Sequence, residues 1–292
     1  MDSTIWDKAA ATRQTAEADG VLESLATELT ICHEGDLTFH LRQLSNLKRK
    51  HTQQASVEGK DHFNPFLPHE EAMYVNCVGP KHKLLLNKFN VLDDHLLLVT
   101  NQFEPQQSIL NSDDFSALTR CMFPEPCLAF YNSGKRAGAS QSHKHLQLIK
   151  LPAESHRLIA FQKELSTLHD EVPRELTSLP FKHAALALPR EIFHSRTLAI
   201  EEGARLLQHL YNRLRMTLGI EASSGIIESP YNLLLTWEWM MMVPRTDESS
   251  AGISLNSLAF IGSILVKNSE QARQLEAAGL TQTLRQVSSQ SA

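Results

Sequence analysis

Two histidines and a glutamine, His143, His145 and Gln147, stand at alternate positions of the sequence and are the residues best suited to carry chemistry. The apolar segment that contains them predicts a strand over residues 143–151. Side chains two residues apart in a strand point to the same face of a sheet, so these three share one face. Such a polar row is unusual for a protein core, because buried polar groups need hydrogen-bond partners. The spacing therefore predicts a functional site.

The loop before this strand, residues 132–142, is rich in small and hydroxyl-bearing residues and carries two cations. Backbone N–H groups of such loops can bind phosphate oxygens. A neutral imidazole can attack phosphorus and form a covalent intermediate, provided that its other ring nitrogen donates to a fixed acceptor. The Gln147 amide could donate to a phosphate oxygen, and nearby cations could stabilise charge on the transferred group. The pattern indicates a phosphoryl-type site whose nucleophile is His143 or His145.

Simpler interpretations of the same residues exist. Two histidines can lie on an exposed edge strand, or can bind zinc, although no third ligand stands near them in the sequence. The basic cluster at 48–51 is by default a solvated face. Met240–Met242 are by default core filling, and Arg245 could simply hold a carboxylate. The combination of both histidines with Gln147 and the small-residue loop favours the phosphoryl-type site.

The periodicity of apolar residues predicts the elements that must position these side chains. Helices are predicted at 5–31, 112–122, 153–170, 198–218 and 268–287. Strands are predicted at 35–47, 83–87, 95–100, 127–132, 143–151, 231–236 and 239–245. The strands at 83–87 and 95–100 should pair antiparallel, because their connection is too short for a helical crossover. Ser112 should cap its helix, and the two prolines of 64–68 should keep that segment rigid and extended.

This order of elements predicts an α+β fold, in which helices pack against an antiparallel sheet that carries the histidine strand. Proline recurs and the periodicity breaks between Pro152 and Pro189. We expect two portions, 1–170 with the histidine strand and 171–292 with a further helix and a hairpin.

Composition narrows the class of protein. The chain has 292 residues and a formal net charge of −5, which argues against a uniformly basic nucleic-acid binder. Four cysteines fit neither a paired metal site nor a disulfide framework. The N-terminus lacks the pattern of a signal peptide, and no run approaches the roughly 18 apolar residues of a membrane span. We expect a cytoplasmic protein that binds neither nucleic acid nor membranes.

The segment His143–Gln147, preceded by Gly138–Gln141, resembles the active-site strand of the histidine-triad superfamily, in the branch with Gln in place of the third His. That branch includes galactose-1-phosphate uridylyltransferase and the ATP adenylyltransferases, also called diadenosine tetraphosphate phosphorylases. Further segments resemble the latter family in its own order, namely Asn64–Phe66, Leu85–Asn90, Leu97–Thr100, Phe181–His183, Tyr231–Thr236, Val243–Arg245 and Asn256–Phe260. The resemblance runs from about residue 40 to the C-terminus and implies a histidine-triad, uridylyltransferase-like fold.

The resemblance also implies roles for individual residues. His145 would be the adenylylated nucleophile, and His143 and Gln147 would complete the catalytic set. The residues implied as substrate contacts are Lys50, Asn87, Lys88, Asn132, Gly138, Ala139, Ser140, Gln141, Thr236, Met241 and Arg245. In this set the loop and Asn132 would line the phosphate path, and Lys50 would reach the distal phosphates. Thr236, Met241 and Arg245 would close over a second nucleotide.

The implied activity is phosphorolysis. Inorganic phosphate would convert diadenosine tetraphosphate to ATP and ADP, and the reverse, through adenylyl-histidine. Relatives with Gln are mostly transferases and those with a third His mostly hydrolases, so Gln147 favours transfer. We expect a monomer that binds diadenosine polyphosphates, ATP, ADP and phosphate, with no tightly bound cofactor and with Mg²⁺ accompanying the nucleotide. The alternatives are a uridylyl- or guanylyltransferase and a nucleotide-binding regulator without turnover.

Overall fold

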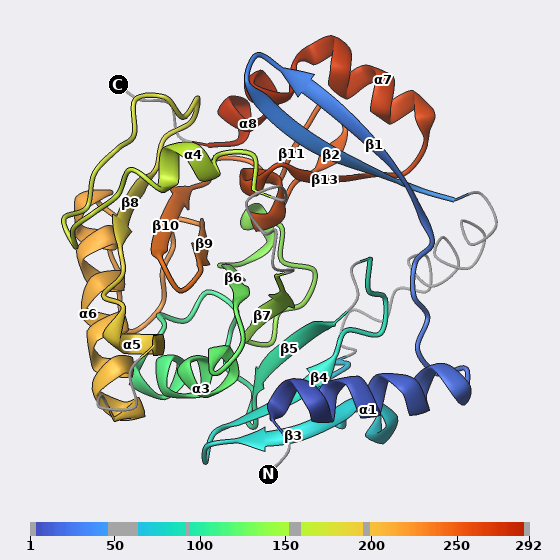
Figure 1. Ribbon diagram of the computed structural model, residues 1–292, viewed down its shortest axis with the longest axis vertical. Coiled ribbons are helices and arrows are strands. Elements are labelled where there is room, and N and C mark those ends of the chain that lie inside the picture. Colours follow the sequence, from blue (N-terminus) through green and yellow to red (C-terminus); the bar gives the residue numbers. More distant parts are fainter. Residues whose placement is uncertain (1–3, 46–63, 92–93, 152–158, 195–198, 289–292) are drawn as a thin grey trace.

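One large antiparallel sheet organises the molecule. The computed structural model describes residues 4–45, 64–91, 94–151, 159–194 and 199–288 (Figure 1). The eight strands of the sheet follow the order β3-β4-β5-β7-β6-β9-β10-β8, and every neighbouring pair is antiparallel. The strands are β3 (Tyr74–Val78), β4 (His82–Leu86), β5 (His95–Thr100), β6 (Cys127–Asn132), β7 (His145–Lys150), β8 (Ala184–Ala187), β9 (Tyr231–Leu235) and β10 (Trp239–Pro244). The α+β class with an antiparallel sheet is therefore confirmed.

Two smaller sheets contain the other strands of the described chain. In the first, β2 lies in the middle, antiparallel to β1 and parallel to β13. The second is a two-stranded ribbon of β11 and β12. Their bounds are β1 (Thr27–Glu34), β2 (Leu37–Leu44), β11 (Ser249–Ser250), β12 (Ile253–Ser254) and β13 (Ser263–Val266). The first small sheet therefore joins the N-terminal part of the chain to its C-terminal part.

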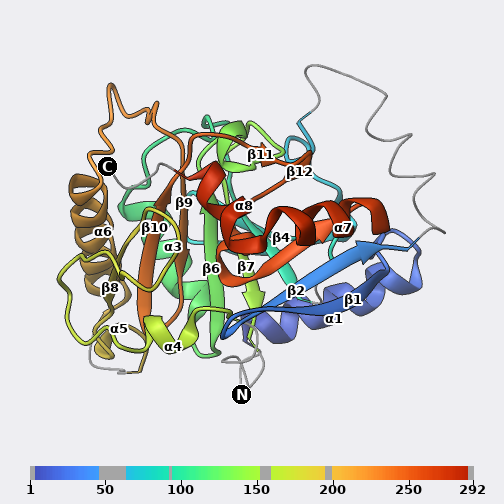
Figure 2. The same ribbon diagram turned by 90° about the horizontal axis from the view of Figure 1, so that it is seen from above.

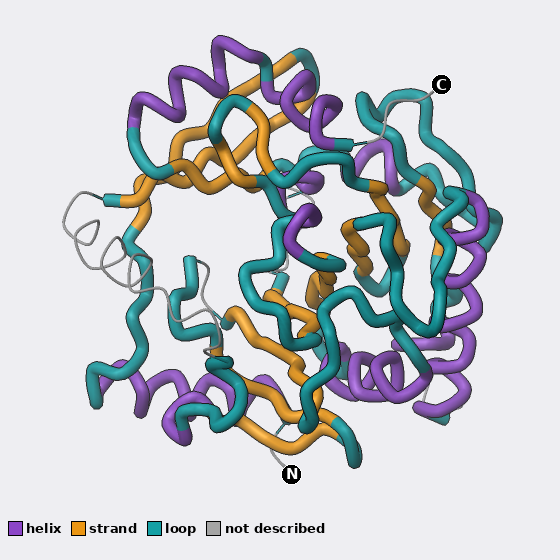
Figure 3. Tube along the Cα trace, turned by 180° about the vertical axis from the view of Figure 1, so that it is seen from behind, coloured by secondary structure: helices purple, strands orange, loops and turns teal. Residues whose placement is uncertain are grey.

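Helices pack against the large sheet and against the three-stranded sheet (Figures 2 and 3). The α-helices are α1 (Ile5–Ala18), α3 (Ser112–Met122), α4 (Gln162–Leu165), α5 (Glu191–His194), α6 (Ile200–Thr217), α7 (Ser269–Ala278) and α8 (Leu280–Val287). Short 3-10 helices are η1 (Glu71–Met73), η2 (Lys135–Ala137) and η4 (Ser257–Ile261). No helix in the described ranges is long and apolar enough to cross a membrane.

The large sheet separates two hydrophobic cores. On one face, residues such as Leu98 and Leu148 pack with α1, α3 and α6. On the other face, residues such as Leu234 pack with β2, η4, α7 and α8. A third, small cluster covers β4 and β5 on this second face with Leu85 and Val99. The polar side chains of β7 therefore emerge on the second face, between two apolar clusters.

Most predicted strands and two predicted helices are confirmed in place. These are the strands at 35–47, 83–87, 95–100, 127–132, 231–236 and 239–245 and the helices at 112–122 and 198–218. The predicted antiparallel pairing of β4 with β5 is also confirmed. The capping residue of α3 is Asn111 and not Ser112, because the Asn111 side chain accepts from the N–H groups of Asp113 and Asp114.

The helix predicted at 5–31 is too long. It ends at Ala18, and the left-handed conformation of Gly20, with φ of +67°, turns the chain away. Leu29, the last apolar residue of the predicted helical period, lies instead in β1, opposite Arg42 of β2. Antiparallel pairing with β2 stabilises the strand there, so the long-range partner overrides the local pattern.

Three further predictions need correction. The helix at 268–287 is broken into α7 and α8 at Gly279, where φ is +83°. Within the described part of 153–170, only Gln162–Leu165 is α-helical, because the N–H of Ala160 donates to the distant carbonyl oxygen of Ile261 instead of continuing a helix. Residues 64–68 form a turn, since the carbonyl and side chain of Asn64 both accept backbone N–H groups of that segment.

A buried ion cluster anchors the back of the histidine strand. Lys144 lies on the first face, completely buried, with its Nζ 2.6 Å from Asp114 Oδ2 and 3.2 Å from Glu104 Oε2. His82 Nε2 lies 2.9 Å from the other oxygen of Asp114. Burial alone would raise the pKa of Asp114, but the His82 hydrogen bond and the Lys144 charge lower it below its usual value. The cluster therefore ties α3 and β4 to the start of β7.

Removal of one partner should be costly. In Asp114→Asn, Lys144 would remain buried with only the partly exposed Glu104 as counter-charge, so the unfolding free energy should fall by about 3–5 kcal/mol. The double variant Asp114→Leu with Lys144→Met should recover much of this loss, because no buried charge remains. Urea unfolding measures both, with Glu270→Gln of the exposed Arg273–Glu270 pair as a control expected to change nothing measurable. Equal stability of Asp114→Asn and the wild type would contradict the argument.

Candidate active site

His145 presents one free ring nitrogen to the second face of the sheet. Its Nδ1–H donates to the carbonyl oxygen of His143 at 2.8 Å, which places the lone pair on Nε2. The residue is 4% exposed, and burial lowers the pKa of its ring to about 4. Nε2 has no hydrogen-bond partner among the described residues. His145 is therefore a neutral imidazole whose unprotonated nitrogen is available.

His143 differs, because both of its ring nitrogens are engaged. Its Nε2–H faces the carbonyl oxygens of Thr100 and Gln102 at 3.0 and 3.1 Å. Its Nδ1 accepts from Asn64 Nδ2 at 3.0 Å. His143 precedes β7 and forms only an isolated bridge, although the strand was predicted to begin there. Strand geometry alone left both histidines as candidate nucleophiles, and these contacts favour His145.

The turn at 64–68 covers the two rings. The Phe66 ring lies 5.3 Å from the His145 ring and 5.6 Å from the His143 ring, between centroids. Phe66 is buried with Val99 in the third cluster, and its N–H donates to Asn64 Oδ1. This apolar cover contributes to the burial that lowers the pKa of both histidines, since it disfavours the charged imidazolium.

A relay of hydrogen bonds orients Gln147. Asn87 Nδ2 donates to His95 Nδ1 at 3.2 Å, so the proton of the His95 ring is on Nε2. His95 Nε2–H then donates to Gln147 Oε1 at 2.8 Å. Burial lowers the pKa of His95 to about 4, which keeps the ring neutral. With Oε1 occupied, the amide N–H groups of Gln147 remain to donate within the site.

The loop between β6 and β7 is held close to the C-terminal part of the chain. Gly138 has a φ of +88°, and a Cβ at this position would lie 2.6 Å from the carbonyl oxygen of Leu255. Only glycine fits such a close approach of two backbones. The N–H groups of Ser140 and Gln141, further along, donate to no described residue. They lie near the start of β7 and are suited to bind an anion.

A buried network of polar side chains holds this loop in place. Asn132 Oδ1 accepts from Asn232 Nδ2 at 2.8 Å and from Ser257 Oγ at 2.7 Å. Arg245, 3% exposed, donates through Nη1 to Asn232 Oδ1 at 2.7 Å. Both Asn232 Nδ2 and Arg245 Nη1 also donate to the carbonyl oxygen of Ala137, next to Gly138. Burial lowers the pKa of Arg245 to about 10, and in the described chain it bonds carbonyl and amide oxygens instead of a carboxylate.

The structure separates the predicted site residues into groups. It brings His143, His145, Gln147 and Asn87 together, with Gly138, Ala139, Ser140 and Gln141 in the adjoining loop. Five other side chains have their contacts elsewhere. Lys88 pairs with Glu70 at 2.8 Å, Thr236 accepts the Glu238 N–H in the β9–β10 turn, Met241 is buried in the second core, and Arg245 and Asn132 lie in the network. Lys50 lies outside the described residues, and contacts of all these residues with substrate stay predictions.

Sequence reasoning missed the residues that fix the protonation of the His143 ring and the orientation of the Gln147 amide. These are Asn64, His95 and Thr100, none of which was proposed individually. His95 alternates with Leu97 and Val99 in a predicted strand, so a polar residue on an apolar face was a usable signal. Asn64 and Thr100 act through contacts with distant parts of the chain, which the sequence pattern does not reveal.

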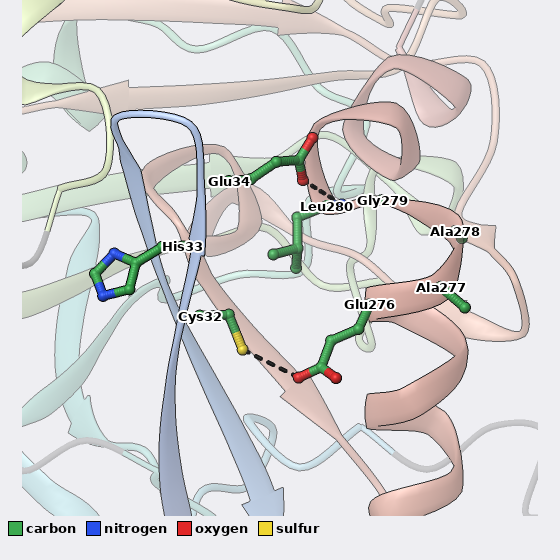
Figure 4. A pocket seen from close by; sticks show the side chains of 8 residues that line it. All are labelled: Cys32, His33, Glu34, Glu276, Ala277, Ala278, Gly279 and Leu280. Carbon is green, nitrogen blue, oxygen red and sulfur yellow. Dashed lines mark hydrogen bonds between the residues drawn. The ribbon is translucent and has the colours of Figure 1, made fainter.

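A pocket elsewhere lies between the end of β1 and the α7–α8 junction (Figure 4). There the Cys32 thiol donates to Glu276, and the Glu34 carboxylate accepts the N–H of Leu280 at the start of α8. None of the residues predicted from the sequence lines this pocket. Within the described ranges, no three His, Cys, Asp or Glu side chains come together as metal ligands. These groups are therefore explained by helix capping and packing.

The fold and the site together define a class. It is an α+β protein in which one strand of an antiparallel sheet carries a neutral histidine. Within the described ranges, one ring nitrogen of this histidine and the N–H groups of Ser140 and Gln141 in the adjoining loop have no partner, and an oriented glutamine amide lies beside them. The chain belongs to the Ap4A phosphorylase family. Residues 1–165 match the Ap4A phosphorylase N-terminal domain, and residues 177–290 match the ATP adenylyltransferase C-terminal domain. The family resemblance predicted from the sequence is thus confirmed.

Two yeast proteins and two crystal structures of a yeast enzyme are similar to this chain. The chain is 30% identical over 285 residues to Protein APA1 of Saccharomyces cerevisiae, covering 88% of this chain and 85% of the relative. It is 32% identical over 221 residues to diadenosine 5',5'''-P1,P4-tetraphosphate phosphorylase 2 of the same yeast, covering 67% and 65%. The crystal structure of yeast Ap4A phosphorylase Apa2 in complex with Ap4A superimposes with a TM-score of 0.78 at 26% identity, covering all of both chains. The complex with AMP gives 0.80 at 27%, again covering 100% of each chain.

The buried histidines predict a pH dependence of stability. His95 and His145 have pKa values of about 4 in the folded chain and near 6.5 when unfolded. Between these values the unfolded chain binds more protons, so the unfolding free energy should fall as pH decreases from 6.5 to 4, by up to about 3 kcal/mol for each ring. Urea unfolding across this range measures the slope. His95→Phe should reduce it, whereas His169→Gln, at an exposed histidine, should not. A slope unchanged by His95→Phe would contradict the assignment.

Proposed function

We propose that this protein phosphorolyses diadenosine tetraphosphate to ATP and ADP through an adenylyl intermediate on His145. The observation that carries the proposal is the protonation pattern of the two neighbouring histidines. In the described chain, His145 has a free and unprotonated Nε2, whereas both ring nitrogens of His143 are bonded. Membership of the Ap4A phosphorylase family and similarity to Apa2, crystallised with Ap4A and with AMP, support the choice of substrate.

In the first step, Nε2 of His145 attacks an α-phosphorus of diadenosine tetraphosphate. A bond forms between nitrogen and phosphorus, and the bond to the bridging oxygen breaks, so ATP leaves and AMP remains on the ring. Positive charge that develops on the imidazole is shared through Nδ1–H with the carbonyl oxygen of His143. The Gln147 amide, held by His95, donates to a non-bridging oxygen as negative charge develops there.

In the second step, an oxygen of inorganic phosphate attacks the same phosphorus from the side that ATP has left. The phosphorus–nitrogen bond breaks, ADP forms, and His145 returns to its neutral state. The open N–H groups of Ser140 and Gln141 are suited to hold the acceptor or the leaving phosphates. Both steps use phosphate oxygens that are already anionic as leaving group or nucleophile, so neither needs a general acid or base.

Neither step needs a general acid or base, and this gives a physical reason for Gln147. A third histidine could take a proton from water, whereas an amide has no titratable proton to exchange. An anionic acceptor needs no such help, so phosphate is favoured over water. In this proposal the protein binds nucleotides as its partners, and Mg²⁺ accompanies the polyphosphate. The protein acts as a monomer in the cytoplasm. The predicted division into portions 1–170 and 171–292 belongs to the same proposal.

Product analysis tests the proposal directly. Diadenosine tetraphosphate with phosphate should give ATP and ADP in equal amounts. Without phosphate it should give a single equivalent of ATP and an acid-labile, alkali-stable adenylyl protein. Turnover to ATP and AMP without phosphate would identify a hydrolase. Binding with no product over hours would identify a regulator, and faster turnover of the diuridine or diguanosine analogue would identify a different base preference.

Substitution of the nucleophile should abolish both steps. His145→Ala removes the only group proposed to carry AMP, so kcat should fall at least about a thousandfold and no adduct should form. His169→Ala, at an exposed histidine, is the matched control and should keep the activity of the wild type. Full phosphorolysis by His145→Ala would overturn the proposal.

Removal of the hydrogen-bond relay through His95 should lower kcat and leave KM almost unchanged. His95→Phe keeps an aromatic ring in the same buried place, beside Phe130, but removes the donor that orients Gln147. We expect kcat to fall roughly tenfold to hundredfold, with little change in KM, because the amide loses its fixed direction. His183→Phe, at another buried histidine away from the site, is the control and should keep kcat. An unchanged kcat in His95→Phe would exclude the orienting role.

A further inference from the structure

The sheet is interrupted beside His145. Strands β6 and β7 pair as far as Phe130 and Gln147. In this register Tyr131 would follow opposite Leu146 and Asn132 opposite His145, but the pairing with β7 ends, although β6 continues along β9 as far as Asn132. His145 is paired with Val99 of β5 on its other side, and its N–H and carbonyl groups lack a main-chain partner in β6. A buried N–H or carbonyl group without a partner is unfavourable. Another group must therefore occupy the gap.

The side-chain amide of Gln106 fills this gap. Its Oε1 accepts the N–H of His145 at 2.9 Å. Its Nε2 donates to the carbonyl oxygens of His145 at 3.1 Å and of Asn132 at 2.8 Å. The residue is 1% exposed, so these bonds are not exchanged for water. One primary amide thus takes the place of a peptide group between β6 and β7.

Gln106 is itself firmly held. Its N–H donates to the carbonyl oxygen of Ser142 at 2.8 Å, and its carbonyl oxygen accepts the hydroxyl of buried Tyr131. Close by, the N–H of Lys144 donates to the carbonyl oxygen of Glu104 at 2.8 Å. The segment that contains Gln106 therefore runs as a short substitute strand beside the start of β7. Movement of Gln106 would displace both backbone groups of His145.

We propose that Gln106 is a positioning residue for His145, which aims Nε2 at the phosphorus by fixing the main chain on both sides of the ring. The inference rests on the proposed function, because it concerns the direction of attack. Among the described residues, the ring itself makes one hydrogen bond, from Nδ1 to the carbonyl oxygen of His143, and packs against Phe66. A side chain that cannot both donate and accept would release the main chain, and small misplacements of a reacting group slow a reaction strongly.

Two substitutions separate shape from hydrogen bonding. Gln106→Met keeps the length of the side chain and removes all three bonds, so kcat should fall at least about tenfold with less than about a twofold change in KM. Gln106→Glu keeps the acceptor and loses both donors, and a carboxylate would face two carbonyl oxygens. Its activity relative to the wild type should recover as pH falls, because the protonated carboxyl regains one donor. A purely structural role would not produce this pH profile.

The control variant is Leu207→Ala, in buried α6 on the first face of the sheet, which should lower the melting temperature and keep kcat. Nitrogen NMR of the His145 ring adds a readout that does not depend on activity. The wild type should show the Nδ1–H tautomer, and Gln106→Met a mixture. Wild-type kcat and tautomer in a folded Gln106→Met would overturn the inference. If Gln106→Met does not fold, a flat relative pH profile of Gln106→Glu would do so. Absence of phosphate-dependent turnover in the wild type would instead count against the proposed function.

Discussion

The hydrogen bond from His145 Nδ1 to the carbonyl oxygen of His143 is the interaction on which the site depends. It assigns the proton to one ring nitrogen and leaves the other as a lone pair. Burial then keeps the ring neutral by lowering the pKa to about 4. A bond between residues two apart in an extended segment is local, but it holds only if the intervening peptide cannot rotate. Much of the surrounding structure restrains that peptide.

The restraint comes from both faces of the same strand. On the first face, Lys144 extends into a buried pair with Asp114, so the residue between the two histidines cannot turn outward. On the second face, Phe66 covers both rings and His143 is bonded at both nitrogens. Successive side chains of a strand point to opposite faces, so the two faces have different roles. His143, His145 and Gln147 form the polar site on the second face, and Lys144 anchors the strand on the first face.

This alternation is also why so much could be predicted from the sequence. The apolar segment identified the strand and its alternation identified the polar face, since both depend on local geometry. The proton position of the His143 ring and the orientation of the Gln147 amide could not be predicted, because they depend on Asn64, His95 and Thr100, which come from other elements. The helical pattern that ran beyond Ala18 failed for the same reason. Pairing of β1 with β2 decides that segment, and a local period cannot report it.

The two halves of the chain cannot be assigned separate tasks at this site. The histidines belong to the first half, but β6 pairs with β9 of the second. The carbonyl oxygen of Ala137 is held by Asn232 and Arg245, and Gly138 lies against the backbone of Leu255. The loop whose Ser140 and Gln141 N–H groups bond no described residue is therefore shaped by residues of the second half, which lie 95 and 108 positions from Ala137 in the sequence. A buried arginine that touches no carboxylate in the described chain is well suited to this task, because its five donors can hold several carbonyl groups at once. Arg245 then contributes to the site by holding the loop that lines it.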